Sequence, residues 1–303
     1  MVEFCATDVG KLSQAELFKR GWGGDTSNFV VSAARTGSKT GYMCRLGDDE
    51  FGRSFKELWG AEGVDYSRVI VDPGGWTAIY IISLMEGGGH DFTYYRSGSA
   101  ASRYCVEDLD QDYVASAKVF HASGITLAVS ESLREAALQA MDICKEAGGM
   151  VTLDINMRTK LWPIKTARTV LEQAFRRANT VFASAEDLNT LYGANDPSII
   201  AKYIRGLGPE NVVIKLGSRG CQVESDDEAF RCPGFKVETV DTTGAGDAFD
   251  GAWVTAIIDG WTLKEAARFA NAAGAITATG LGAVAPIPFR SQVLNMMEAS
   301  WHG

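Results

Sequence analysis

The segment from Asp241 to Phe249 reads Asp-Thr-Thr-Gly-Ala-Gly-Asp-Ala-Phe and combines two glycines with a carboxylate where a helix can start. It follows β-branched residues at 237–240 and precedes a helix-compatible segment at 248–258. Glycines let a ligand approach the backbone, and the first N–H groups of a helix, at the positive end of its dipole, bind phosphate well. A carboxylate is a poor neighbour for a resting phosphate. We therefore predict that Asp247 accepts a proton from a nucleophile beside the place where phosphate charge is neutralised.

A plain turn between a strand and a helix would contain the same residue types, and a lone Gly-x-Gly-Asp does not decide between the two interpretations. From about residue 119 onward, segments typical of strands and of helices alternate, which predicts a mostly parallel sheet covered by helices. Strands are predicted at 118–123, 149–154, 180–183 and 211–216, helices at 132–147, 166–178, 185–192 and 197–207, and a hairpin at 220–230. Ser132 with Glu135, and Thr262 with Glu265, match the capping box that starts a helix.

The first hundred residues have a different pattern. Glycine clusters at 21–24, 74–75 and 87–89 surround short apolar segments at 77–84 and 91–95, which is typical of antiparallel hairpin strands. We predict a small antiparallel β lid on a larger α/β body. The lid would comprise 8–22 and 74–98, and the body 23–73 and 99–303.

The composition is that of an ordinary α/β protein, with 303 residues, 46% hydrophobic and 22% charged, and a net charge of -9. The negative charge argues against nucleic acid or an anionic membrane as a partner. Six cysteines without a Cys-x-x-Cys pair indicate free thiols in a reducing compartment, and three histidines lack the spacing of a zinc site. No signal peptide or membrane-spanning apolar run is recognisable, so we expect a cytoplasmic enzyme.

Two further segments carry residues suited to ligand binding. In Gly-Gly-Asp-Thr-Ser-Asn at 23–28, the glycines allow close approach and Asn28 donates and accepts hydrogen bonds, although a glycine turn before an amphipathic helix at 27–36 has the same pattern. In the strand-like run at 92–96, alternation places Tyr94 and Arg96 on one face. An arginine there is suited to a carboxylate, but a surface arginine packed on a tyrosine would look the same.

Taken together, the run at 241–249, the run at 23–28 and Gly-Asp-Asp-Glu-Phe-Gly at 47–52 resemble the signatures of the ribokinase-like (PfkB) family of sugar and nucleoside kinases, in the same order along essentially the whole chain. The resemblance implies a three-layer α/β body with a β lid, ATP as phosphoryl donor and Mg²⁺, and it leaves a monovalent cation open. It also implies that Asp247 deprotonates the sugar hydroxyl. The residues implied to bind the transferred phosphoryl group are Gly244, Ala245, Gly246 and Arg158.

Around 92–100 the chain resembles 2-keto-3-deoxygluconate kinases, in which the corresponding tyrosine and arginine contact the acid sugar. The Asp-x-Asn-x-Arg pattern at 154–158 also occurs in fructokinase-like relatives and does not choose the sugar, and Asp154 and Arg158 would alternatively pair with each other on a loop. The substrate-binding residues implied by the resemblance are Gly23, Gly24, Asn28, Tyr80, Tyr94, Arg96, Arg158 and Asp247.

The resemblance also implies a nucleotide side. Ser184 and Asp187 match a capping box, and in the family the acid at this position lies near Mg²⁺, which Asp187 would reach only through water. Lys215 either reaches a phosphate or is solvated at a strand end. Asn271 and Gly274 either line the adenine pocket or serve helix packing. The nucleotide-binding residues implied are Ser184, Lys215, Gly217, Gly220, Gly244, Gly246, Asn271 and Gly274.

We therefore predict an ATP-dependent kinase for the primary hydroxyl of a sugar acid, most similar to 2-keto-3-deoxygluconate kinase, with Asp247 ionised at neutral pH. The alternatives are a fructokinase or ribokinase acting on a neutral sugar, and a non-catalytic sugar-acid sensor on a kinase fold. A dehydrogenase is disfavoured because no early Gly-x-Gly-x-x-Gly is present. An exposed β lid favours a homo-oligomer. Relatives usually have strand residues before Met1, so the resemblance predicts an incomplete first strand.

Overall fold

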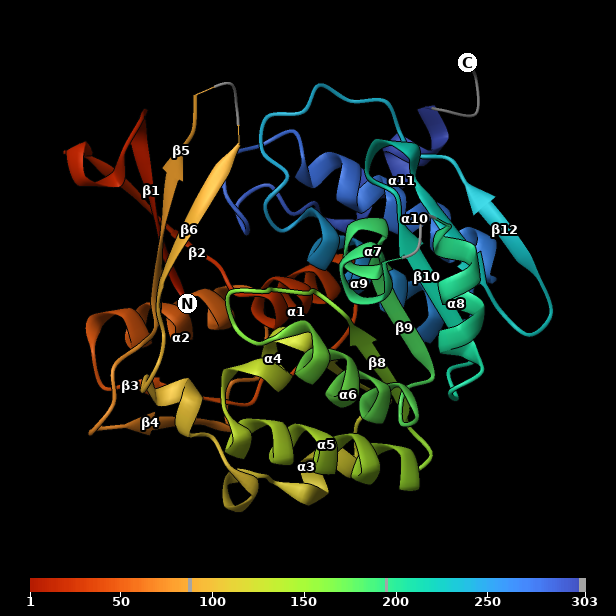
Figure 1. Ribbon diagram of the computed structural model, residues 1–303, viewed down its shortest axis with the longest axis horizontal. Helices are drawn as coiled ribbons and strands as arrows, with labels where there is room; N and C mark the ends of the chain where they lie inside the picture. Colours follow the sequence, from red (N-terminus) through yellow and green to blue (C-terminus); the bar gives the residue numbers. More distant parts are fainter. Residues whose placement is uncertain (87–88, 194–195, 300–303) are drawn as a thin grey trace.

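The computed structural model describes residues 1–86, 89–193 and 196–299. Residues 87–88 of the predicted lid, and 194–195 and 300–303 of the predicted body, lie outside the described residues, as therefore does most of the glycine cluster at 87–89. In Figure 1 the lid strands stand at the left and the main sheet at the right.

The main sheet has six strands in the order β12-β11-β10-β9-β8-β7. They are β7 (Val119–Ser123), β8 (Met150–Asp154), β9 (Thr180–Ser184), β10 (Asn211–Lys215), β11 (Cys221–Glu224) and β12 (Ala229–Cys232). Strands β7 to β10 are parallel because helices return the chain between successive strands, whereas β11 and β12 are added as an antiparallel hairpin. The carboxyl ends of four strands therefore meet at one edge, where α/β proteins bind ligands.

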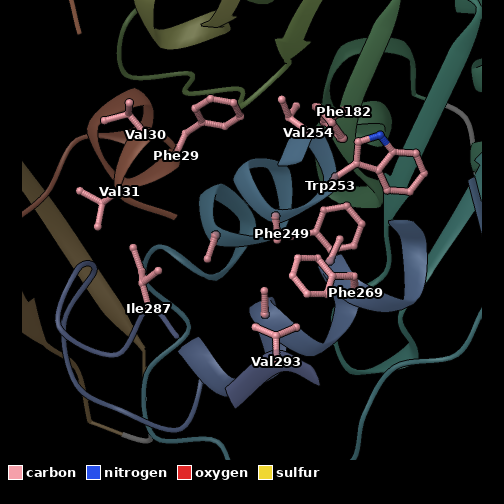
Figure 2. Close-up of a cluster of buried hydrophobic side chains, with 14 of the residues drawn as sticks. Phe29, Val30, Val31, Phe182, Phe249, Trp253, Val254, Phe269, Ile287 and Val293 are labelled. Carbon is pink, nitrogen blue, oxygen red and sulfur yellow. The ribbon is translucent and has the colours of Figure 1, made fainter. Parts of the chain in front are cut away.

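Helices cover both faces of the main sheet, which confirms the predicted three layers. Successive strand side chains point to opposite faces, so Phe182 joins the core under α1, α9 and α10, while Val181 joins the core under α4 to α8. Figure 2 shows Phe182, Phe249 and Trp253 in the first core. The helices are α1 (Asp25–Thr36), α2 (Glu50–Ala61), α3 (Gln111–Ala115), α4 (Gly124–Val129), α5 (Glu131–Glu146), α6 (Ile164–Phe175), α7 (Ala185–Tyr192), α8 (Pro197–Arg205), α9 (Ala245–Ile258), α10 (Leu263–Thr277) and α11 (Arg290–Ala299).

The lid is a separate four-stranded sheet in the order β2-β1-β5-β6. Its strands are β1 (Val2–Val9), β2 (Phe18–Trp22), β5 (Ile79–Leu84) and β6 (His90–Tyr95). The two outer pairs are antiparallel, as predicted, and the central pair, β1 with β5, is parallel. The parallel pair arises because the chain passes through α1, β3 (Cys44–Gly47), α2 and β4 (Val69–Asp72) between these strands instead of turning in a hairpin.

The sheet includes β1 from Val2, so it starts before the predicted lid segment, and the division into lid and body at the stated boundaries stays a prediction. Self-association through the lid likewise stays a prediction. Short 3₁₀ turns complete the described elements: η1 (Leu12–Gln14), η2 (Ala100–Arg103), η3 (Val106–Asp108) and η4 (Gly217–Arg219).

The predicted strands and helices between 118 and 232 are confirmed to within a few residues at their ends. The capping box at Thr262 is confirmed, but the one predicted at Ser132 is wrong. The N-cap of α5 is Ser130, whose backbone is extended and whose Oγ accepts from the N–H of Leu133 at 3.2 Å. All six cysteines are free thiols. Across the described ranges, no helix combines the length and apolarity needed to cross a membrane.

Candidate active site

The glycine-rich run forms the N-terminal turn of α9. Gly244 is the N-cap residue, with a φ of 78°, and a Cβ on it would lie 2.5 Å from the carbonyl oxygen of Ala283. The turn therefore requires glycine for its conformation and for its packing. Among the described residues, the N–H groups of Gly244 and Gly246 donate to no backbone carbonyl, whereas that of Ala245 donates to Thr242 O at 3.2 Å. Two of the three N–H groups predicted to bind the phosphoryl group are thus open to an anion in this conformation.

Asp247 lies in the first turn of α9 and faces α1. The two helices approach closely because Gly251 has no side chain: a Cβ there would lie 2.5 Å from the carbonyl oxygen of Phe29. This packing lets Nδ2 of Asn28 donate to Oδ2 of Asp247 at 2.8 Å. The structure therefore brings together two predicted substrate-binding residues from opposite ends of the chain, and the amide orients the carboxylate.

A second carboxylate, Asp25, begins α1 on the same side. Ser123, at the end of β7, donates its hydroxyl to Oδ2 of Asp25. The two preceding glycines make the approach possible, because Gly24 has a φ of 118° and a Cβ on Gly23 would lie 2.0 Å from the Tyr80 hydroxyl. Asp25, which lies between the predicted residues Gly24 and Asn28 in the sequence, is therefore also part of the site, next to the lid.

Burial and a like charge change the acidity of Asp247. Asp247 is half-buried, and the loss of hydration at its carboxyl, followed by the negative charge of Asp25, raises its pKa to about 7. The hydrogen bond from Asn28 opposes the shift. A pKa near 7 makes Asp247 only partly ionised at neutral pH, whereas the sequence predicts an ionised carboxylate, because burial and the nearby charge of Asp25 disfavour the charged form. A pKa near the working pH suits a general base.

This pKa predicts the pH dependence of the reaction. Only the carboxylate form of Asp247 accepts a proton, so kcat/KM for the sugar should rise with pH and reach half its plateau near pH 7. The measurement is a series of initial rates between about pH 5 and 9, with buffers overlapped at each step. A profile without an inflection near neutrality would contradict the assignment. The folded-state pKa lies above the ordinary value of 3.8, so this group's contribution to stability is complete below 3.8 and is lost as pH rises through about 7.

Lys215 ends β10 and is enclosed by two carboxylates. Its Nζ lies 3.0 Å from Oδ2 of Asp154 and 2.9 Å from Oδ2 of Asp250. The side chains of Lys215, Asp154 and Asp250 are 14%, 5% and 1% exposed. The interpretation of Lys215 as a solvated residue is therefore wrong, because the first turn of α9 covers the end of β10. The alternative pairing of Asp154 with Arg158 is also wrong, because Asp154 pairs with Lys215.

The lid adds aromatic rings and one cation. Tyr80 on β5 and Tyr94 on β6 lie directly opposite each other, with ring centres 6.1 Å apart. The Tyr80 hydroxyl donates to Glu3 on β1 at 2.5 Å. Arg96 follows β6, and its guanidinium carbon lies 5.9 Å from the centre of the Tyr94 ring. Its Nε is buried and, within the described ranges, has no hydrogen-bond partner.

A cavity of about 140 Å³ lies between the lid and α1. Arg96 and Asp25 both line it, together with Thr26, Tyr42 and Thr126. Burial lowers the pKa of Arg96, and the negative charge of Asp25 opposes that shift. The cavity therefore presents the cationic side chains of Arg96 and Arg45 and the carboxylate of Asp25, in addition to hydroxyl groups.

Two predicted site residues, Arg158 and Asp187, lie in or against the loop after β8. Arg158 is exposed, donates from Nη1 to Met157 O at 2.9 Å and forms no ion pair within the described part of the chain. Ser184 and Asp187 form the predicted capping box of α7. Oδ1 of Asp187 also accepts from the N–H of Met157 at 2.9 Å, so both carboxylate oxygens are engaged. The roles of Arg158 at the phosphate and of Asp187 near a metal stay predictions.

The predicted nucleotide side is built from tight turns. Gly217 has a φ of 62°, and Gly220 has a φ of 87° with no room for a Cβ, which would lie 2.1 Å from Cys232 O. Nδ2 of Asn271 donates to the same Cys232 carbonyl at 3.2 Å. A Cβ on Gly274 would lie 3.1 Å from the carbonyl oxygen of the first residue of α9. Asn271 and Gly274 therefore have packing roles, and their contact with adenine stays a prediction.

The acidic side chains of the site are suited to a metal ion that binds together with the phosphates of a nucleotide. Among the described residues, no three His, Cys, Asp or Glu side chains are arranged to hold a metal ion. Oδ1 of Asp154, however, is buried without a hydrogen-bond partner in the described part of the chain. Mg²⁺ usually keeps several waters and binds one or two carboxylates together with substrate phosphates. The free oxygen of Asp154 therefore fits the water shell of an Mg²⁺ ion bound to a nucleotide, whereas the role of Asp187 stays a prediction.

Three acidic residues of the site are not among the residues predicted from the sequence. Asp25 has a detectable signal, because it stands between two predicted glycines and Asn28. Asp250 also has one, because it is a single acid in the otherwise apolar part of α9. Glu3 has none, because its contact with Tyr80 depends on the pairing of β1 with β5.

Comparisons with known proteins agree with this geometry. Residues 1–290 match the family described as pfkB family carbohydrate kinase. Fructokinase-1 of Oryza sativa subsp. japonica is 36% identical over 311 residues, which cover 99% of this chain and 96% of its own. A PfkB protein from Polaromonas sp. JS666 has a TM-score of 0.88 at 32% identity, covering 97% of this chain and 96% of its own. A candidate ribokinase II from E. coli, solved with ATP and Mg²⁺, has a TM-score of 0.91 at 25% identity, covering 99% and 96%.

The similarity to 2-keto-3-deoxygluconate kinases is supported only at the level of the fold. A 2-dehydro-3-deoxygluconokinase from Thermotoga maritima has a TM-score of 0.89 but is 22% identical, covering 98% of this chain and 95% of its own. The curated relatives of higher identity are fructokinases, such as those of rice and of Zea mays, the latter 35% identical over 98% of this chain and 95% of its own. The predicted family is confirmed, and the predicted preference for a sugar acid is not.

Proposed function

Because this chain belongs to the pfkB family of carbohydrate kinases, and is therefore an ATP-dependent sugar kinase, we propose that it phosphorylates the primary hydroxyl of a neutral sugar of the fructose type. The observation that supports this acceptor is the chemistry of the sugar side, where Asp25, Asn28 and Asp247 gather. Sugar hydroxyls donate to carboxylates, whereas a substrate carboxylate would meet two negative charges there. The fructokinase relatives point to the same class of acceptor.

A sugar acid is the second candidate acceptor, and Arg96 is the observation that favours it. Its buried Nε lacks a partner among the described residues and is suited to a carboxylate. Asp25 lines the same cavity and already offsets part of its charge, which is the reason we place this candidate second.

The proposed reaction is a direct transfer. Asp247 takes the proton of the primary hydroxyl while its oxygen bonds to the γ-phosphorus, and the bond from that phosphorus to the β–γ bridging oxygen breaks, so that ADP leaves. The open N–H groups of Gly244 and Gly246, and the positive end of the α9 dipole, offset the charge on the transferred group. Mg²⁺, when bound with ATP, neutralises the phosphate charges. The lid sheet limits access of water to the site, so that ATP is not hydrolysed instead.

The acceptor is tested by sugar-dependent release of ADP. We expect kcat/KM for fructose to exceed the values for ribose, adenosine and 2-keto-3-deoxygluconate by about tenfold or more, because one well-made hydrogen-bond difference is worth that much. A preference for 2-keto-3-deoxygluconate would overturn the neutral-sugar proposal. Arg96→Ala would then be expected to raise KM for the acid by about tenfold or more and leave KM for fructose unchanged.

The non-catalytic alternative gives a different result in the same assay. A sugar-acid sensor would bind 2-keto-3-deoxygluconate without releasing ADP, whereas the carboxylate at Asp247 and the open turn at Gly244 support turnover. Activation by a monovalent cation stays a prediction from the family resemblance.

A further inference from the structure

Asp250 lies on α9 one turn beyond Asp247 and is buried. It is 1% exposed, and its two carboxylate oxygens lie 2.9 Å and 3.2 Å from Nζ of Lys215. The opposite side of Nζ contacts Asp154, 3.0 Å away. The ammonium group is therefore held from two sides, by one carboxylate from α9 and one from the end of β8.

Two carboxylates keep this buried lysine charged. Burial alone would lower the pKa of Lys215, but the charges of Asp154 and Asp250 raise it above its ordinary value. The ring of Phe182 lies 5.9 Å from Nζ and adds no competing acceptor. Asp154 and Asp250 thus keep Lys215 cationic and also fix the position of its ammonium group.

The cation lies against the turn predicted to bind the phosphoryl group. A Cβ on Gly246 would stand 3.3 Å from Nζ of Lys215, so the ammonium packs directly on the first turn of α9. The N–H of Gly246 is one of the two that donate to no carbonyl among the described residues. A fixed positive charge at this distance strengthens the anion-binding field of the turn, because it acts in a place where water is largely excluded.

We propose that Asp250 is a positioning residue for phosphoryl transfer, which together with Asp154 holds the Lys215 ammonium against the N-terminal turn of α9. The proposal rests on transfer at this turn, but not on which sugar accepts the phosphate. Asp250 acts through Lys215 and does not contact the reacting atoms. Its carboxylate also partly cancels the charge that it positions, so its benefit is geometric: without it, Lys215 would swing toward Asp154 and away from Gly246.

A double-mutant cycle tests the proposal, with kcat, both KM values and the unfolding temperature as readouts. Asp250→Asn should lower kcat by about 10²-fold, the effect of misplacing a group by about 1 Å, and leave KM for sugar and ATP within a few-fold. Lys215→Met should lower kcat by roughly 10²–10³-fold and lower the unfolding temperature, because two buried carboxylates lose their counterion. In the double variant kcat should match that of Lys215→Met, while the unfolding temperature partly recovers because one of the two carboxylates is gone.

The matched control is Asp259→Asn. Asp259 caps the other end of α9 and pairs with Arg290 at 2.6 Å, so its loss changes the same helix without touching Lys215. We expect wild-type kcat in this variant.

Two results would overturn the proposal. One is an Asp250→Asn variant with wild-type kcat, whatever its unfolding temperature, which would show that Asp250 does not act on phosphoryl transfer. The other is a double variant whose kcat loss equals the product of the two single losses, or whose activity recovers together with its stability. The test of Asp250 does not depend on the proposed acceptor. If the native protein prefers a sugar acid, the neutral-sugar proposal fails, but the same double-mutant cycle can be measured with that acid as the substrate.

Discussion

Replacing Asp247 by Asn is expected to lower kcat for sugar-dependent ADP release by roughly 10²–10⁴-fold, the range that a positioned general base contributes. The amide oxygen of the new side chain can still accept from Nδ2 of Asn28, which lies 2.8 Å from the carboxylate in the native protein. The substitution therefore removes the basic group and preserves its shape. We expect KM for both substrates to stay within a few-fold, because binding does not require proton transfer.

The unfolding temperature of the same variant shows whether its activity is lost because the base is missing or because the protein is unfolded. The pKa of Asp247 is raised to about 7, so its ionised form destabilises the folded state above that pH. Asp247→Asn should unfold at the same or a higher temperature than the native protein at pH 8. The control is Asp142→Asn. Asp142 lies on α5, is half-exposed and pairs with Arg177, so this variant should keep full activity. Turnover close to normal in Asp247→Asn would remove Asp247 from the role of base.

Asp25→Asn is expected to have the second largest effect, on the affinity for the sugar. Hydrogen bonds to charged groups contribute about 1.5–3 kcal/mol, so KM for the sugar should rise roughly 10- to 150-fold when the carboxylate becomes an amide. KM for ATP should not change. The charge of Asp25 also helps to raise the pKa of Asp247, so the inflection of kcat/KM should move to lower pH in this variant.

The two effects of Asp25→Asn have one cause and should appear together. Steady-state rates over a range of sugar concentrations, repeated at several pH values, measure both. Asp48→Asn is the matched control, because Asp48 is 59% exposed and pairs only with Arg53 among the described residues. An unchanged KM for the sugar together with a shifted pH profile would mean that Asp25 acts on Asp247 and does not bind the substrate.

The sequence by itself determined the layers, most of the elements and the place of the anion-binding turn. These features depend on local properties. The apolar run of β10, at 211–215, must be buried on both faces, and the glycines before α9 must form a turn that exposes N–H groups. The resemblance carried by 23–28 and 241–249 extended this to the family. The preference for a sugar acid was inferred from the residues around Arg96. That local pattern does not show that Asp25 lines the same cavity.

Only the tertiary structure decided which charged groups face one another. Asn28 and Asp247 are 219 residues apart and meet because α1 and α9 pack closely at Gly251. Lys215 is enclosed between strand and helix ends, and the pKa of Asp247 follows from its burial near Asp25. Charge pairing and acidity depend on distances through space and on the exclusion of water, and neither is encoded in the spacing of residues along the chain.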